Sequence, residues 1–146
     1  MAARTLPLYV DGKFVAARDS TQDVVNPATG EVIARAGRAS REETRAAIQA
    51  ARNAFDRGPW PGFTAMKRGA VLLQVARALR ERTAELARPE TENMGKPIIE
   101  SEMDVADAAT CFEYYGGLAT KIHGEVLPVP DDALSLALKE PMGVAE

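Results

Sequence analysis

Short apolar runs separated by turn residues occupy the first forty positions of the chain. Two such runs within residues 8–15 lie on either side of Asp11-Gly12, a dipeptide that accepts positive φ at both central positions of a type I′ turn. Val24-Val25 and residues 32–34 flank a second turn segment, Asn26-Pro-Ala-Thr-Gly30. We expect two hairpins, and therefore antiparallel β structure throughout this region.

From position 40 the apolar residues recur at helical spacing. Ser40 and Glu43 have the spacing of a capping box, which predicts a helix from there to about Asp56. The segment 58–62, Gly-Pro-Trp-Pro-Gly, is expected to stop this helix. The apolar stripe of this helix is narrow and made mostly of small residues, so the helix should approach a neighbour closely. The stripe consists of Ala47, Ala51, Ala54 and Phe55.

A second and a third helix are predicted before residue 97. The second starts at Thr64, and Thr83 is expected to cap the third, which ends at Gly95 as the residue after the last turn and at Pro97. Pro89 lies inside the third, where a proline costs roughly 3 kcal/mol. The core stripe of the second helix is Val71, Leu72, Val75 and Leu79.

A fourth helix is expected to open at Pro97 and to stop before Gly116-Gly117. Its predicted core positions are Val105, Ala108, Ala109 and Phe112, with the acidic residues facing outward. Beyond it, residues 126–129 and 134–138 are predicted to be extended, and the pattern at 142–146 is that of the middle of a strand.

Composition narrows the possible partners. The 146 residues include 18 basic and 21 acidic side chains, a formal charge of -3, so we expect neither nucleic acid nor a membrane as a partner. No segment approaches the roughly 20 apolar residues of a membrane span, and the first residues lack a signal-peptide pattern. Cys111 is the single cysteine, which excludes an intramolecular disulfide and favours a reducing compartment. The cytoplasm is therefore the expected location.

The chain offers few candidate catalytic nucleophiles or bases. The chain has no Gly-x-Gly-x-x-Gly segment and no Walker-type loop. We interpret Cys111 as a partly buried thiol on the fourth helix and His123 as a surface residue in a loop. A catalytic site built from these two side chains would require a nucleophile and a base within hydrogen-bond reach.

Two charged features have structural explanations beside functional ones. Glu100, Asp104 and Asp107 share one helix face and could offer oxygen ligands to a divalent cation, but a solvated face is the simpler interpretation. Lys96 could be imagined as a phosphate binder, yet a cation at a helix C-terminus already has an electrostatic reason to be there.

Six short motifs, taken in order, resemble the aldehyde dehydrogenase superfamily, and they are closest to its betaine-aldehyde-like branch. Each is weak alone, but their order and spacing make coincidence improbable. They are Tyr9-Val-Asp-Gly-Lys-Phe14, Asn26-Pro-Ala-Thr-Gly-Glu31, Glu85-Leu-Ala-Arg88 with Glu92-Asn-Met-Gly-Lys-Pro97, Glu113-Tyr-Tyr-Gly-Gly117, Lys121-Ile-His-Gly-Glu125 and Lys139-Glu-Pro-Met-Gly-Val144.

The resemblance implies an α/β family fold with a Rossmann-like cofactor domain. Residues 1–125 would be the N-terminal part of the NAD(P)-binding domain, an α+β region of antiparallel hairpins and about four amphipathic helices. Residues 126–146 would be a linker and the first strand of an oligomerisation element, with Leu134 to Val144 as that strand. The catalytic domain would be absent.

The family's reaction implies cofactors and partners, but no catalytic residues here. In such enzymes a cysteine attacks an aldehyde, hydride passes to NAD or NADP, and a glutamate activates the water that releases the acid. In the family's pattern these residues and the cofactor contacts fall after position 146, so none can be assigned in this chain. NAD or NADP is not expected to bind the chain alone, and a homo-oligomer is expected once the rest of the enzyme is present.

One family site reaches this segment. The resemblance places backbone carbonyl ligands of a monovalent cation, K⁺ or Na⁺, at Val24, Val25 and Asn93, although two strand residues and a helix end have a structural interpretation as well. Two departures bear on stability: Pro89 replaces an apolar helix residue, and Lys67 stands where a capping glutamate is common.

Two hypotheses for the function follow. We favour an N-terminal fragment of an NAD(P)-dependent aldehyde dehydrogenase, which converts an aldehyde to a carboxylic acid, with the fragment inactive alone. The alternative is a non-catalytic interaction module that pairs with full-length subunits through an exposed strand at residues 134–144.

Overall fold

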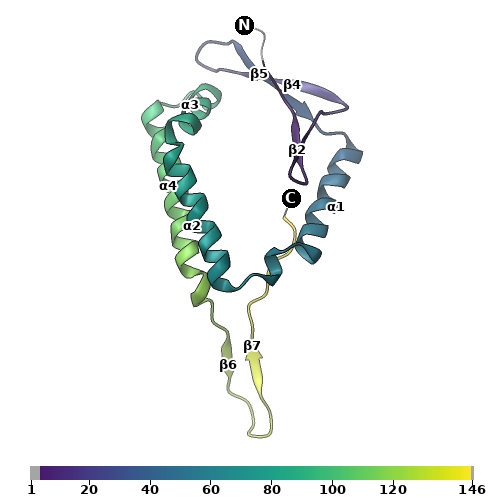
Figure 1. Ribbon diagram of the computed structural model, residues 1–146, viewed down its shortest axis with the longest axis vertical. Helices are drawn as coiled ribbons and strands as arrows, with labels where there is room; N and C mark the ends of the chain where they lie inside the picture. Colours follow the sequence, from purple (N-terminus) through teal and green to yellow (C-terminus); the bar gives the residue numbers. More distant parts are fainter. Residues whose placement is uncertain (1–3, 146) are drawn as a thin grey trace.

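The computed structural model describes residues 4–145 and is a mixed α/β arrangement of four long helices and three small sheets (Figure 1). In chain order the elements are β1 (Arg4–Leu6), β2 (Leu8–Val10), β3 (Lys13–Val15), β4 (Ser20–Val25), β5 (Val32–Arg38), α1 (Arg41–Arg57), η1 (Trp60–Gly62), α2 (Ala65–Glu81), α3 (Thr83–Met94), α4 (Ile98–Leu118), η2 (Ala119–Lys121), β6 (Glu125–Leu127) and β7 (Ser135–Ala137). None of the helices in the described part combines the length and apolar character needed to cross a bilayer.

Both predicted N-terminal hairpins are present. β2 and β3 pair antiparallel around Asp11 and Gly12, whose φ angles of 51° and 73° suit the predicted type I′ turn. β4 and β5 also pair antiparallel, with a register shift between Val24 and Val25.

The expectation of purely antiparallel structure was wrong for β1. This strand pairs in parallel with β5, with Arg4 opposite Ala34, so the sheet order is β1-β5-β4. Turn dipeptides report only pairings between neighbouring segments, and the β1–β5 pairing joins segments that are far apart in the sequence.

Helix α1 begins at the predicted capping box. The Ser40 hydroxyl accepts a hydrogen bond from the Glu43 N–H at 3.2 Å, and the Glu43 carboxylate accepts from the Ser40 N–H at 2.9 Å. The same carboxylate accepts from the Arg18 N–H at 3.2 Å, which ties the connection between β3 and β4 to the start of the helix. Among the described residues α1 contributes no buried side chain, so its small apolar face is largely uncovered.

Helices α2 and α4 lie side by side, and their closest crossing is made by two glycines (Figure 1). A Cβ on Gly69 would lie 2.6 Å from the Gly116 carbonyl oxygen, so the backbones approach more closely than any side chain permits. The prediction that α4 stops before Gly116 was wrong, because the helix continues to Leu118. The glycine serves close packing there rather than helix termination.

The start of α3 also differs from expectation. Arg82 ends α2 and precedes α3 directly, and Thr83 is the first helical residue rather than a cap. Its hydroxyl donates to the Arg80 carbonyl at 3.0 Å, because the two helices are almost continuous and no free N-terminal turn needs a side-chain partner. Exposed Pro89 lies inside α3, and Gly95 ends the helix with φ 79° as predicted.

The C-terminal segment forms a short hairpin of β6 and β7. Of the segment expected to be a strand, Leu134 to Val144, only Ser135–Ala137 is a strand here, because its pairing with β6 ends at Ala137. Further along, Pro141 lacks a backbone donor and Gly143 has φ 116°. Glu146 lies outside the described residues.

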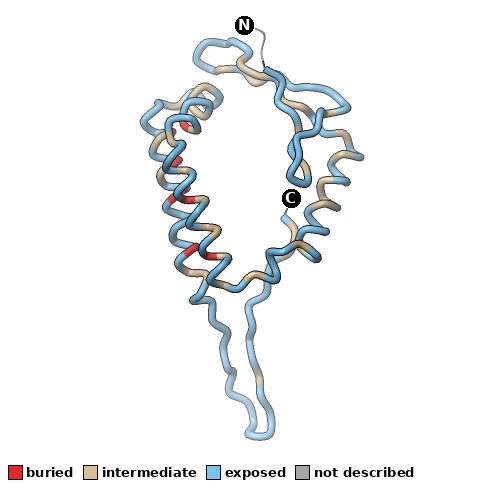
Figure 2. The backbone as a smooth tube through the Cα atoms, viewed as in Figure 1, coloured by how far each residue is buried: buried red, intermediate tan, exposed pale blue. Residues whose placement is uncertain are grey.

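Buried residues gather on one side of the molecule, within α2, α3 and α4 (Figure 2). The buried hydrophobic side chains of the described chain are Ala76, Ala87, Val105 and Ala109. Phe112, a predicted core residue, is 37% exposed, although it lies on the same helical face as Val105 and Ala109. A compact protein of 15.7 kDa would expose about 7,300 Å², roughly 4,200 Å² less than the 11516 Å² observed. The elements are formed, but most of their apolar surface is uncovered.

Candidate functional site

The candidate cation ligands of β4 lie at a β-bulge. Val24 pairs with Ala34 and Val25 with Val32, so Ile33 is the extra residue on β5. Val24 is half-buried and Val25 is 45% exposed. A bulge locally interrupts the ladder and turns backbone groups away from their regular partners, which can leave carbonyl oxygens available to a ligand.

Asn93 lies in the last turn of α3 and is exposed. The last four carbonyls of a helix have no partner within the helix, so the Asn93 carbonyl is available by position. Its side chain plays no part in carbonyl ligation.

A tight contact brings the end of α3 to the turn that follows β4 (Figure 1). A Cβ on Gly95 would lie 2.7 Å from Cγ of Pro27, so these residues touch only because position 95 is glycine. The turn itself is fixed by hydrogen bonds from the Gly30 N–H to the Asn26 carbonyl at 2.8 Å and from the Ala28 N–H to Asn26 Oδ1 at 2.9 Å. The structure therefore brings together the elements that carry the three predicted ligands.

The donor set suits a hard cation held by neutral oxygens. Backbone carbonyls bind alkali ions without a charged side chain, and the described residues include no group of three His, Cys, Asp or Glu that could hold a metal ion. On the acidic face of α4, the side chains of Glu100, Asp104 and Asp107 are all exposed, and Asp104 pairs with Lys96.

Lys96 has a larger role than its position alone suggested. Its ammonium donates to Glu90 Oε1 of α3 at 2.5 Å and to the Asp104 carboxylate of α4, and its side chain is only 19% exposed. The hydrogen bonds that Lys96 donates to Asp104 and, to a smaller extent, to Glu90 raise the pKa of Lys96. Sequence reasoning missed this bridge, because the angle between α3 and α4 decides whether one lysine can reach an acid on each helix.

The two candidate nucleophilic groups lie apart from this region. Cys111 is exposed on α4, so the expectation of a partly buried thiol was wrong. The face of α4 that packs on α2 carries Val105, Ala109 and Gly116, and Cys111 points away from it. His123 is exposed in the segment after η2, as predicted.

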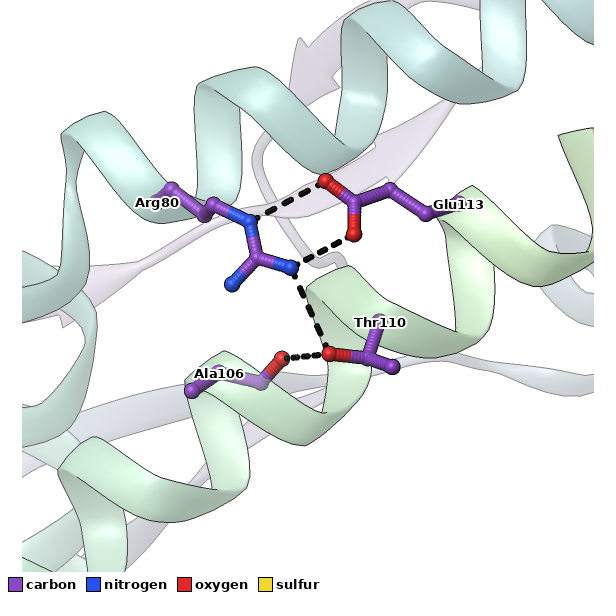
Figure 3. A network of polar contacts seen from close by, with 4 residues as sticks. All are labelled: Arg80, Ala106, Thr110 and Glu113. Atoms are coloured by element: carbon purple, nitrogen blue, oxygen red, sulfur yellow. Dashed lines mark hydrogen bonds and ion pairs between the residues drawn. The ribbon is translucent and has the colours of Figure 1, made fainter.

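A polar network joins α2 to α4 on the packed side (Figure 3). Arg80 donates to both carboxylate oxygens of Glu113, at 3.2 and 2.6 Å, and to the Thr110 hydroxyl at 3.3 Å. The hydrogen bonds from Arg80 lower the pKa of Glu113. This pair is structural: it aligns the two helices and leaves no group free for chemistry.

An open groove of about 560 Å³ lies between α1 and the β2–β3 turn. It is lined by Asp11, Ala46, Gln49, Ala50, Asn53, Ala54, Arg57, Gly58 and Pro59. Its wall is a helix side rather than a glycine-rich turn at a helix N-terminus, so it lacks the usual cradle for a dinucleotide phosphate.

Known proteins share this arrangement. The aldehyde dehydrogenase family matches residues 14–146. Betaine aldehyde dehydrogenase of Bacillus subtilis is 39% identical over 140 residues, and aldehyde dehydrogenase family 2 member B4 of Arabidopsis thaliana, a mitochondrial protein, is 41% identical over 140 residues. Each match covers 94% of this chain, but only 28% and 26% of the respective relative.

Solved structures give the same result. An NAD-dependent aldehyde dehydrogenase from Sinorhizobium meliloti superposes with a TM-score of 0.87 at 37% identity, over 95% of this chain and 28% of its own. A betaine aldehyde dehydrogenase from Staphylococcus aureus in complex with NAD⁺ gives a TM-score of 0.79 at 38% identity, over 85% of this chain and 25% of its own.

The fold and the sequence together define a segment of an α/β protein. The chain belongs to the aldehyde dehydrogenase family, whose members have a Rossmann-like fold, and its match is of the betaine aldehyde dehydrogenase kind. It spans about a quarter of the length of the relatives it matches.

Proposed function

We propose that this chain is the N-terminal part of an NAD(P)-dependent aldehyde dehydrogenase and is inactive alone. Residues 1–125 would be the outer part of the cofactor domain, and residues 126–146 a linker and the start of the oligomerisation element. The catalytic cysteine, the water-activating glutamate and the nicotinamide contacts would be supplied by the rest of the enzyme.

The observation that carries this proposal is that the helices and strands are well formed while many of their apolar side chains are exposed. Helices α1 and α2 have side-chain caps and α3 ends at a glycine, yet large apolar side chains stay in solvent. The most exposed include Phe14, Met66, Tyr9, Val126 and Leu134, each 64% exposed or more. Apolar surface on this scale implies a covering partner, and in this family the remaining three quarters of the subunit would provide it.

Monovalent cation binding belongs to the same proposal. Carbonyls of Val24, Val25 and Asn93 would hold K⁺ or Na⁺, with a further ligand from the rest of the enzyme. The Gly95–Pro27 contact supports this, because it brings the carriers of these carbonyls together.

The assembled enzyme would act as a homo-oligomer in the cytoplasm on an aldehyde, using NAD or NADP. NAD is favoured by the NAD⁺ complexes of the similar Staphylococcus aureus enzyme. The interaction-module alternative has lost its main support, since its strand is only three residues long and is already paired with β6 on one side.

Complementation tests the proposal. The chain is co-expressed with the Bacillus subtilis betaine aldehyde dehydrogenase from which the matching 140 residues have been removed. Aldehyde-dependent NADH formation should appear with both pieces and with neither alone. The excised Bacillus segment, added in place of this chain, is the positive control.

Matched variants make the result specific. Gly69→Leu, which cannot fit against Gly116, should abolish complementation, whereas Gly117→Ala, which has open space, should retain it. Restoration by the Bacillus segment but not by this chain would refute the proposal, as would NADH formation by the chain alone.

A further inference from the structure

We infer that Lys96 is a positioning residue that holds the last turn of α3 against the turn between β4 and β5. It would thereby set where the Asn93 carbonyl lies relative to the carbonyls of β4. The effect on the Asn93 carbonyl rests on the proposed cation site, whereas the effect on α3 rests on the contacts of Lys96 alone.

Lys96 lies at the corner between α3 and α4 and bonds to both helices. Its ammonium is held between Glu90 of α3 and Asp104 of α4 while its stem is largely buried. One cation shared by two carboxylates fixes the angle at which the helices meet, and without it the carboxylates would repel each other.

The same corner is fixed at two further points. The Gly95 N–H donates to the Thr91 carbonyl at 2.8 Å, which closes the end of α3. The Thr91 and Ser101 hydroxyls are 2.8 Å apart, and Ser101 is fully buried. The corner is therefore a compact unit that shifts as a whole, with Lys96 as its only charged bridge between the two helices among the described ion pairs.

This unit contacts the neighbouring turn through one rigid point. Gly95 lies against the Pro27 ring so closely that no Cβ fits between them. A proline ring cannot rotate away, so a change in the corner must displace the turn or open the contact. Through the contact of Gly95 with Pro27, Lys96 can thus affect the turn between β4 and β5 without a hydrogen bond of its own to that turn.

Amide hydrogen exchange tests the coupling in the full chain. The Gly30 N–H, which is bonded to the Asn26 carbonyl, reports on the turn. Lys96→Met should speed its exchange by about tenfold, since local opening of the turn becomes easier. Lys96→Arg, which keeps the charge, should restore slow exchange.

Arg80→Met is the matched control. It removes another bridge between two helices, Arg80 to Glu113, but at a place away from the corner. Gly30 exchange should not change in this variant. Equal acceleration by both methionine variants would mean general destabilisation and would overturn the inference, as would unchanged exchange in Lys96→Met or an unprotected Gly30 in the unaltered chain.

A second measurement separates the inference from the cation site. Calorimetry with potassium chloride on the reconstituted enzyme should show binding weakened by about fivefold in Lys96→Met and unchanged in Arg80→Met. If the unaltered enzyme binds no potassium, the proposed cation site is refuted while the exchange result still decides the role of Lys96. Equal potassium affinity in both variants would overturn the link between Lys96 and the site.

Discussion

The two sides of the molecule differ in how tightly they are packed. The helices α2, α3 and α4 carry every buried residue of the described chain, and apart from Val105 these residues are glycine, alanine and serine (Figure 2). The side formed by the first five strands and α1 has no buried residue, although its hairpins and its capping box are fully formed.

The difference separates local from tertiary stabilisation. Turn residues and caps are sufficient to define the elements of the open side, because they satisfy backbone groups within a few residues. The packed side adds contacts between helices that are distant in sequence, and these are the contacts that make unfolding cooperative. Substitutions should therefore act cooperatively on one side and only locally on the other.

The largest effect is expected at the glycine crossing of the packed side. Gly69→Ala places a Cβ 2.6 Å from the Gly116 carbonyl oxygen and should lower the free energy of unfolding by about 3 kcal/mol. Urea unfolding followed by far-UV circular dichroism measures it. Gly117→Ala, with open space, is the control and should be neutral or slightly stabilising. Equal losses in both variants would show that the crossing is not tightly packed.

Removal of the helix-interior proline should act in the opposite direction. Pro89→Ala restores a backbone donor in α3 at an exposed position and should stabilise the packed side by about 2 kcal/mol. The same urea experiment reports it. A loss of stability would mean that the proline stabilises a bend that α3 requires.

A smaller loss is expected from the buried hydroxyl pair. Ser101→Ala leaves the Thr91 hydroxyl without its partner at 2.8 Å and should cost about 1 kcal/mol. Thr120→Ala, at an exposed hydroxyl of η2, is the control. No difference between the two variants would place Thr91 in contact with water.

The open side should respond to the loss of its helix cap without involving the packed side. Ser40→Ala should fray the start of α1, at a cost of about 1 kcal/mol to that helix. Residue-resolved NMR shifts should move in the first turn of α1 and stay constant in α2 and α4. Shifts that spread to α4 would contradict the separation of the two sides.

The smallest expected effect depends on pH. The hydrogen bonds from Arg80 lower the folded-state pKa of Glu113, so their contribution is present above the unfolded pKa and is lost as pH falls through the lowered value. The urea midpoint of the unaltered chain should therefore decline on acidification more than that of Glu113→Gln. Equal declines would show that the exposed pair adds nothing measurable.

Sequence reasoning was reliable where the physical signal was local. Asp11-Gly12, the Ser40 capping box and the terminal Gly95 each fix a backbone conformation within a few residues, and all three are confirmed. It failed where the signal was tertiary. A glycine such as Gly116 is a common helix stop. Only its contact with Gly69 on another helix explains why a glycine occurs here inside a helix that continues.

The candidate site shows the same limit. The family resemblance supplied Val24, Val25 and Asn93, but no pattern indicated that Gly95 would lie against Pro27. The bridge made by Lys96 was missed because an ion pair across a corner depends on the angle between two helices, and that angle is absent from the sequence. The strand expected at residues 134–144 is short for the same kind of reason, since its length depends on the pairing with β6, which ends at Ala137.

The parallel pairing of β1 with β5 has a consequence for the order of assembly. During synthesis the residues of β1 leave the ribosome before those of β5, and the strand they join is not complete until Arg38 has followed. The β4–β5 hairpin can close on its own as soon as it emerges, and β1 must then return to its free edge. Strand β1 is thus made before its partner but pairs after the hairpin has closed.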